Sequence, residues 1–358
     1  MTSIGVDLHK KQFTVCYRRS EDDQVFRVYE TTEEGVADFV ATVTCFDQIA
    51  VEQFGFTRGF LKQLKHVPCK VVLVDTTKFI LISRSIKKTD HHDAAALAYG
   101  LEKGILPKAR MRSEAAHQLR SLLAGRQLLI RHRIRIMIQI YSIFSGNGIH
   151  VDARKLRSKI NRDRYGEDRF EMGENATLKI LRNQADMVRG DVAELEEAIH
   201  EACVQMKGYD VLASVPGFGV VTIAYLLSTI DDVDDFASPR ALSAYLGIVP
   251  RTRMSAGVSV PTRRLGRART GAITRHGHGM TRSALVMSIN RLMVHNDSLR
   301  AFYENVKGRR GYRKARTAAA RKLLTFLYFA LKAGKPIEDF SAVKFTTSGF
   351  GLPQVECP

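Results

Sequence analysis

The sequence predicts an α/β domain with a mixed sheet, then a long helical coiled-coil linker and a mainly helical C-terminal domain. Two observations favour this order. Short strand-like runs alternate with helical runs in the first third of the chain, and sustained three-to-four apolar spacing replaces them afterwards. A chain of 358 residues has room for two or three domains. We expect domains at 1–108, 109–208 and 209–340, with a loosely ordered tail at 341–358.

The first domain is predicted from alternating patterns and helix caps. Two strands flank a turn at residues 9–12, and a third strand follows at 24–30. Strand patterns recur at 48–54 and 69–75, and helical patterns lie at 31–43, 57–67 and 89–104. The first three strands are close enough in sequence to pair as an antiparallel meander. The later strands follow crossover helices and should therefore be parallel.

Two long helical stretches, 113–144 and 176–206, form the predicted linker. Their apolar seams favour an antiparallel hairpin or an oligomerising coiled coil. The first stretch contains more arginine than a packing seam needs.

The third domain begins with a predicted helix, turn and helix, in which the turn is Pro216–Gly219. This "PGFG" turn is similar to a helix-hairpin-helix, whose backbone N–H groups contact phosphate, although ordinary helix connections also contain Pro and Gly. Further helices are expected at 238–250, 283–311 and 315–334.

The charge points to a polyanionic partner. Lys and Arg number 55 and Asp and Glu 37, which gives a net charge of +18, and nucleic acid is the commonest partner of such proteins. Residues 251–282 contain eight arginines and no acid. The predicted nucleic-acid interface comprises Arg120, Arg126, Arg131, Arg251, Arg253, Arg263, Arg264, Arg267, Arg269 and Arg275. We find no signal peptide, membrane span or cysteine framework, so we expect a cytoplasmic protein without a membrane partner.

Four carboxylates occupy positions that suggest chemistry. Asp7 lies in an apolar strand, Glu52 ends a buried strand, and Asp90 and Asp93 are one turn apart on a helix. A carboxylate inside a strand is unfavourable unless it is paired or binds a cation. Acids that converge at strand ends suit two Mg²⁺ ions, or Mn²⁺, in phosphoryl transfer.

Simpler explanations exist for each residue alone. Asp90 could be a helix N-cap, Asp93 a first-turn acid that complements the helix dipole, and Glu52 an ordinary strand-end acid. His91 and His92 point elsewhere on the helix and are not expected to be ligands. Ser255 could be a nucleophile if nearby arginine and metal activate it, but it could also be a loop serine.

Several motifs together resemble the DEDD transposases of bacterial insertion sequences of the IS110 group, which are related to the Piv DNA invertases. In the first half these are "GVDLHK", "VEQFG" and "KKTDHHDAAALA". In the second half they are "SVPGFGVVTIAYLL", "AYLGIVP", "SAG" and "GAITRHGHGMTRSAL". The resemblance covers nearly the whole chain in the right order.

The resemblance implies a RuvC-like, RNase H-type first domain in which Asp7, Glu52, Asp90 and Asp93 bind two magnesium ions. It also implies a C-terminal serine nucleophile that links covalently to DNA, with Ser255 as first choice and Ser259 as alternative. Ser255 is followed by Ala256, whereas the family's serine usually precedes glycine directly. Donor and target DNA, a structured bridge RNA, and a homodimer that assembles to a tetramer are the implied partners.

Other functions remain open at this point. A RuvC-type junction nuclease would use water in place of serine, and a Piv-like invertase would invert a segment instead of moving an element. A nucleic-acid-binding protein with an inactive nuclease fold is a third alternative. The sequence leaves open the target site, the guide RNA sequence and the choice between transposition and inversion.

Overall fold

The computed structural model describes residues 2–52, 57–64, 67, 69–75, 79, 89–152, 170–249, 273 and 277–346. Residues 254–255, 258–259 and 350–351 lie in short strands, and only their backbone is described. The chain divides into two compact units, Met1–Met111 and Arg112–Pro358. The predicted C-terminal domain and all but the first three residues of the predicted linker fall within the second unit.

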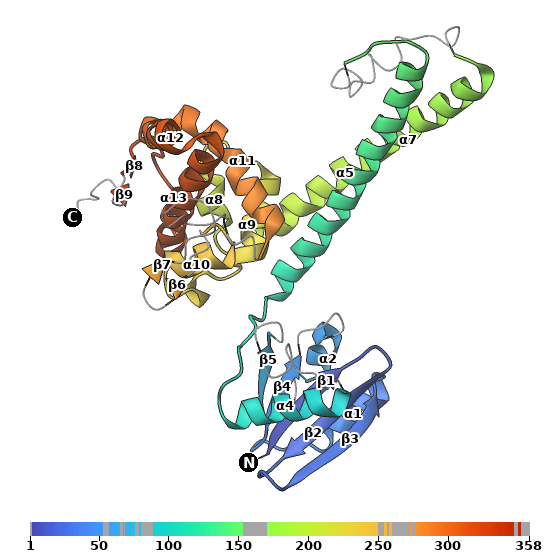
Figure 1. The fold of residues 1–358 in the computed structure, drawn as a ribbon, viewed down its shortest axis with the longest axis vertical. Helices are drawn as coiled ribbons and strands as arrows, with labels where there is room; N and C mark the ends of the chain where they lie inside the picture. Colours follow the sequence, from blue (N-terminus) through green and yellow to red (C-terminus); the bar gives the residue numbers. More distant parts are fainter. Residues whose placement is uncertain are drawn as a thin grey trace. The chain divides into compact units, whose positions relative to one another are not determined.

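A five-stranded mixed sheet forms the centre of the first unit (Figure 1). Its strands are β1 (Ser3–Leu8), β2 (Gln12–Arg18), β3 (Gln24–Glu30), β4 (Gln48–Glu52) and β5 (Lys70–Val74), in the order β3-β2-β1-β4-β5. β1, β2 and β3 are antiparallel, whereas β1, β4 and β5 are parallel. The predicted meander with parallel crossovers is therefore confirmed.

Alternation along β1 assigns its side chains to the two faces of the sheet. Ile4, Val6 and Leu8 are buried in a core with the helices α1 (Glu33–Val40) and α2 (Thr57–Gln63). Gly5 and Asp7 must then face the opposite side, because successive strand residues alternate. Helix α4 (Asp90–Glu102) covers that side, where Ala94 and Ala98 pack against Cys16 of β2.

Small residues allow α4 to lie directly on β1. A Cβ atom added to Gly5 would lie 2.1 Å from the carbonyl oxygen of Ala94 and 2.5 Å from the nitrogen of Ala98. No other residue type fits at Gly5 without moving the helix. The alanine-rich run after Asp93 is therefore the packing face of α4.

The two long helices of the second unit form an antiparallel hairpin (Figure 1). They are α5 (Glu114–Gly146) and α7 (Met172–Val204). Arg126 donates to Glu196 at 2.8 Å, and Asn147 donates to Glu174 at 2.9 Å. Later residues of α5 thus meet earlier residues of α7, as an antiparallel pair requires.

The base of this hairpin shares a core with the C-terminal helices. These are α8 (Tyr209–Ala213), α9 (Val220–Ile230), α10 (Pro239–Tyr245), α11 (Gly279–His295), α12 (Asp297–Arg310) and α13 (Tyr312–Ala333). Leu119 of α5 and Ile199 of α7 belong to the same buried cluster as Leu226 of α9 and Leu323 of α13. The hairpin is therefore an extension of the helical core.

Two predictions for the C-terminal region were wrong. The helix expected at 283–311 is broken at Asn296, which is buried and caps α12 by accepting from the nitrogen of Leu299 at 2.7 Å. The same amide donates to the carbonyl oxygens of Phe340 and Val343 at 2.6 and 2.9 Å. Residues 340–345 are consequently packed against the core, so the start of the predicted tail is ordered.

Candidate active site

The C-terminal ends of β1 and β4 place two acids side by side. Val6 is the register partner of Val51, so Asp7 and Glu52 follow at adjacent positions. Asp7 is only 2% exposed. Its carboxyl group is close enough to that of Glu52 for a side-chain hydrogen bond.

Helix α4 brings the other two acids to the same place. Thr89 is its N-cap, with a hydroxyl that accepts from the nitrogen of His92 at 3.3 Å. The alternative that Asp90 acts as the N-cap is therefore wrong, and Asp90 is the first residue of the helix. Gly5 contacts the helix at Ala94, so Asp7, two strand residues further on, faces the turn before it.

Burial and negative neighbours raise the pKa of Asp7 to about 7. Burial is the largest cause, and the charges of Glu52 and Asp93 act in the same direction, whereas His9 lowers the pKa. The structure thus brings together all four carboxylates selected from the sequence. An excess of negative charge at a buried position favours a bound cation.

His9 is a member of this group that the sequence analysis missed. Its Nε2 lies 3.1 Å from Oδ2 of Asp7 and 3.3 Å from Oδ1 of Asp90. Partial burial lowers the pKa of His9, but the Asp7 and Asp90 carboxylates outweigh it and raise the pKa. The available signal was spacing, since His9 directly follows the last residue of β1 and lies two positions after Asp7.

The donor set fits a divalent metal. One ligand atom from each of Asp7, His9 and Asp90 lies within 4.8 Å of the others, with Glu52 and Asp93 beside Asp7. Carboxylate oxygens suit Mg²⁺ and Mn²⁺, and an imidazole nitrogen suits Mn²⁺ better than Mg²⁺. His91 is outside the group and packs against Phe26, with ring centroids 5.1 Å apart.

The predicted nucleophile lies at the margin of what the structure describes. Ser255 is in β6 (Met254–Ser255) and Ser259 in β7 (Val258–Ser259), two antiparallel strands in which Ser255 pairs with Val258. Their side chains are outside the described residues. Seven predicted nucleic-acid contacts are outside them as well: Arg251, Arg253, Arg263, Arg264, Arg267, Arg269 and Arg275.

The three predicted contacts on α5 have different environments. Arg126 is ion-paired with Glu196, so its charge is already compensated within the hairpin. Arg120 and Arg131 line a cavity beside α9. The sequence pattern treated the three as equivalent, although Arg120 and Arg131 share a face of the helix and Arg126 lies on another.

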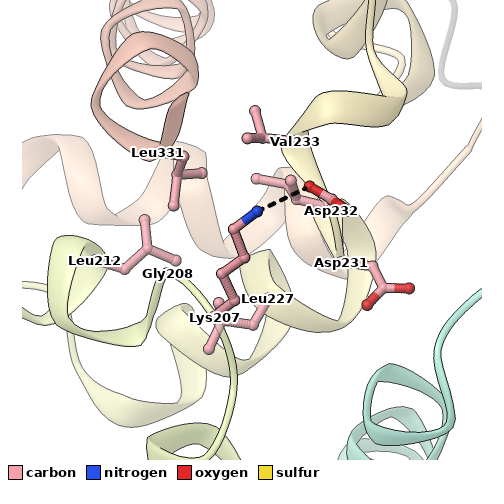
Figure 2. A pocket seen from close by; sticks show the side chains of 9 residues that line it. Lys207, Gly208, Leu212, Leu227, Asp231, Asp232, Val233 and Leu331 are labelled. Carbon is pink, nitrogen blue, oxygen red and sulfur yellow. Dashed lines mark ion pairs between the residues drawn. The ribbon is translucent and has the colours of Figure 1, made fainter. Parts of the chain in front are cut away.

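A second hollow in the helical unit is too small for a ligand (Figure 2). Its volume is about 20 Å³, close to the space for one water molecule. Leu212, Leu227 and Leu331 line it, and Lys207 lies across its mouth with Nζ 3.7 Å from Oδ1 of Asp232. We interpret it as a packing defect closed by an ion pair.

Within the described residues, no helix is both long and apolar enough to cross a bilayer.

Comparison with known proteins gives matches in both units. Residues 4–146 match a family model described as a transposase, of the DEDD type in the IS110 group. Residues 209–304 match the model described as the transposase IS116/IS110/IS902 family. These two segments contain the acidic group and the segment with Ser255.

Individual relatives extend along nearly the whole chain. The chain is 32% identical to a pilin gene-inverting protein of Moraxella bovis, over 94% of this chain and 98% of that protein. It is 24% identical to the transposase of insertion sequence element IS1111A of Coxiella burnetii, over 89% of this chain and 86% of that protein. Both units therefore take part in the similarity.

Proposed function

The chain belongs to the IS110/IS116 family of transposases, and we propose that it cuts and rejoins DNA with a two-metal acidic site and a serine nucleophile. The family makes it a DNA transposase or recombinase. The single observation that best supports the proposed chemistry is the group of acids around the buried carboxyl of Asp7.

In this proposal Asp7, Glu52, Asp90 and Asp93 hold two magnesium ions, with manganese as a substitute, in a RuvC-like domain. The bound ions would supply Lewis-acid stabilisation of the charge that develops on the scissile phosphate. The rigid sheet fixes Asp7 and Glu52, while the close contact of α4 with Gly5 fixes Asp90 and Asp93. His9 holds the carboxylates of Asp7 and Asp90 toward one another.

Ser255 is the proposed nucleophile, with Ser259 as alternative. The serine hydroxyl loses its proton as its oxygen attacks phosphorus and forms a serine–phosphate ester. The phosphorus–oxygen bond to the DNA sugar breaks, and the sugar oxygen takes up a proton to become a free hydroxyl. A hydroxyl of the second DNA strand end then attacks the ester and releases serine. The joining step thus needs no external energy source.

The proposed partners are donor DNA, target DNA and a structured bridge RNA that selects both sites. The excess of basic residues supports a polyanionic partner. We propose a homodimer that assembles to a tetramer on nucleic acid, in which the long helices α5 and α7 allow the serine and the carboxylates of one active site to come from different subunits. The site of action would be the bacterial cytoplasm.

Site-specific inversion is a second candidate function. One specific observation favours it: the relative with 32% identity is named a pilin gene-inverting protein. A plasmid that carries the native flanking DNA distinguishes the two, because inversion keeps the segment in place whereas transposition yields an excised circle or a new insertion.

The same plasmid assay tests the chemistry. Ser255→Ala should abolish strand joining but leave metal binding intact, and the Ser255→Ala, Ser259→Ala double variant covers the alternative nucleophile. Rejoining by the double variant would exclude the serine mechanism and favour a hydrolytic nuclease. Full activity of Asp7→Asn, or in the presence of a chelator, would exclude the metal mechanism.

A further inference from the structure

A positively charged cavity lies within the helical unit, between α5, α9 and the start of α11. Its volume is about 410 Å³, which is within the range of small-molecule binding sites. Arg120, Gln127 and Arg131 line it from α5 and Thr229 lines it from α9, while residues 277–281 close it at the start of α11. No Asp or Glu is among its described lining residues.

Two guanidinium groups meet at one imidazole on the wall of this cavity. Nη1 of Arg120 lies 3.3 Å from Nδ1 of His278, and Nη2 of Arg112 lies 3.2 Å from Nε2 of the same ring. Arg112 also donates to the hydroxyl of Tyr245 at 2.9 Å. Within the described part of the chain, neither arginine forms an ion pair with a carboxylate.

This arrangement is unfavourable without an anion. Burial and the neighbouring Arg112 lower the pKa of Arg120. Charged groups removed from water normally have a partner of opposite sign. Arg18, by contrast, is buried in the first unit and pairs with Glu102.

The start of α11 adds hydrogen-bond donors to the same wall. His278 is its N-cap but makes no side-chain capping bond, and the first turn contains no acid. The first N–H groups of a helix and its dipole both favour an anion. Gly277 and Gly279 at this end leave the backbone accessible from the cavity.

From these features we propose that the cavity binds a phosphate group of a nucleic-acid strand, with Arg120 and Arg131 as the principal cationic contacts. The proposal rests on the proposed function for the identity of the strand, whereas the anion chemistry follows from the cavity itself. Gly277 directly follows residues 250–276, which contain Ser255. The proposed phosphate site is therefore adjacent in sequence to the segment that carries the proposed nucleophile.

The test compares arginine variants of the full-length protein by fluorescence anisotropy with a labelled DNA duplex, at several salt concentrations. Arg120→Gln and Arg131→Gln should each weaken binding by about tenfold or more, as expected for loss of a charge-assisted hydrogen bond. Each should also lower the salt slope by about one, the value for one phosphate contact. Arg120→Lys, which keeps the charge, should recover much of the affinity.

Arg189→Gln is the matched control. Arg189 is exposed on α7, and its substitution removes the same charge from the same hairpin. Its affinity should stay within about twofold of wild type, as for loss of an exposed charge without a specific contact. Melting curves check folding, and Arg131, which is exposed, gives a second variant if Arg120→Gln does not fold. Affinities of both cavity variants equal to that of Arg189→Gln would overturn the proposal.

Binding of inorganic phosphate separates two questions: whether the cavity binds an anion, and whether that anion is part of a nucleic acid. If it competes with the duplex in wild type but not in Arg120→Gln, the contact is with a backbone phosphate. If wild type binds phosphate calorimetrically in an Arg120-dependent way but binds no DNA or RNA, the anion site stands and the proposed function fails. Absence of both kinds of binding would refute the cavity as an anion site.

Discussion

The two units of this chain contain clusters of opposite charge. In the first unit, burial and neighbouring carboxylates raise the pKa of Asp7 to about 7. In the second, burial and a neighbouring guanidinium lower the pKa of Arg120. Each site concentrates charge of one sign, and we propose that each binds a ligand of the opposite sign. The net charge of +18 favours a polyanionic partner, but it gives no indication of the acidic site in the first unit.

The two sites also differ in how they are built. The acidic site stands on the ends of adjacent parallel strands and on a helix held at Gly5. The cationic cavity stands on side chains from helices far apart in sequence, α5, α9 and α11. Sheet register makes the first predictable from sequence, whereas helix packing sets the second.

The largest effect should come from removing the buried acid. Asp7→Asn should reduce DNA strand joining by about a thousandfold or more, because metal-based stabilisation of the transition state amounts to several kcal/mol. A plasmid recombination assay measures this. Asp38→Asn, an exposed acid on α1, should retain activity. An equal loss of strand joining in both variants would mean that Asp7 has no specific role in the reaction.

The same substitution should have the opposite effect on stability without metal. Between the usual carboxyl pKa of 3.8 and about 7, Asp7 holds more protons in the folded than in the unfolded chain. The free energy of unfolding should therefore fall as pH rises through this range, by about 4 kcal/mol at about 1.4 kcal/mol per pKa unit. His9, with a raised pKa, adds a loss in the same direction above pH 6.5.

Urea unfolding at several pH values in chelator measures this dependence. Asp7→Asn should flatten it and be more stable than wild type near pH 7, and added Mg²⁺ should stabilise wild type alone. A metal-free stability that increases with pH in wild type, with the same slope in Asp7→Asn, would contradict the raised pKa.

Gly5→Ala tests the contact that positions α4. The added methyl group would overlap backbone atoms of Ala94 and Ala98, so the helix must shift. We expect a loss of about 1–3 kcal/mol in the free energy of unfolding, as for overpacking, together with reduced activity. Gly59→Ala is the control: Gly59 lies in α2 with nothing near its Cβ position, and alanine should stabilise that helix slightly. Equal changes in the free energy of unfolding for the two variants would mean that α4 does not pack closely against Gly5.

The smallest effect should come from His9→Gln. Loss of the imidazole should weaken Mn²⁺ binding by about tenfold, as for removal of a group that supports a metal ligand, and should weaken Mg²⁺ binding less. Isothermal titration calorimetry with each ion measures this preference. Unchanged affinities for both ions would remove His9 from the metal group and leave it as a structural partner of Asp7.

Periodicity in the sequence was sufficient for most of the fold. The strand directions followed from the short meander and the crossover helices. The four carboxylates were selected because Asp7 lies in an apolar strand, Glu52 ends a buried strand, and Asp90 and Asp93 are one turn apart on a helix. His9 was missed because its partner Asp90 comes from a helix far along the chain. A single sequence carries no direct signal of that contact.

Side-chain pairing across helices was the other limit. Arg120 and Arg126 are six residues apart on α5, yet Arg126 pairs with Glu196 and Arg120 lines the cavity. The break at Asn296 depends on carbonyl groups near residue 340, which local helix propensity cannot anticipate.

The proposed chemistry requires that the acids around Asp7 form a divalent-metal site. Titration of the metal-free protein with Mn²⁺, followed by electron paramagnetic resonance of the free ion, tests it most directly. We predict saturable binding by wild type that Asp7→Asn abolishes, with recombination activity following occupancy of the site. Equal binding by the two proteins, or activity at zero occupancy, would contradict the account.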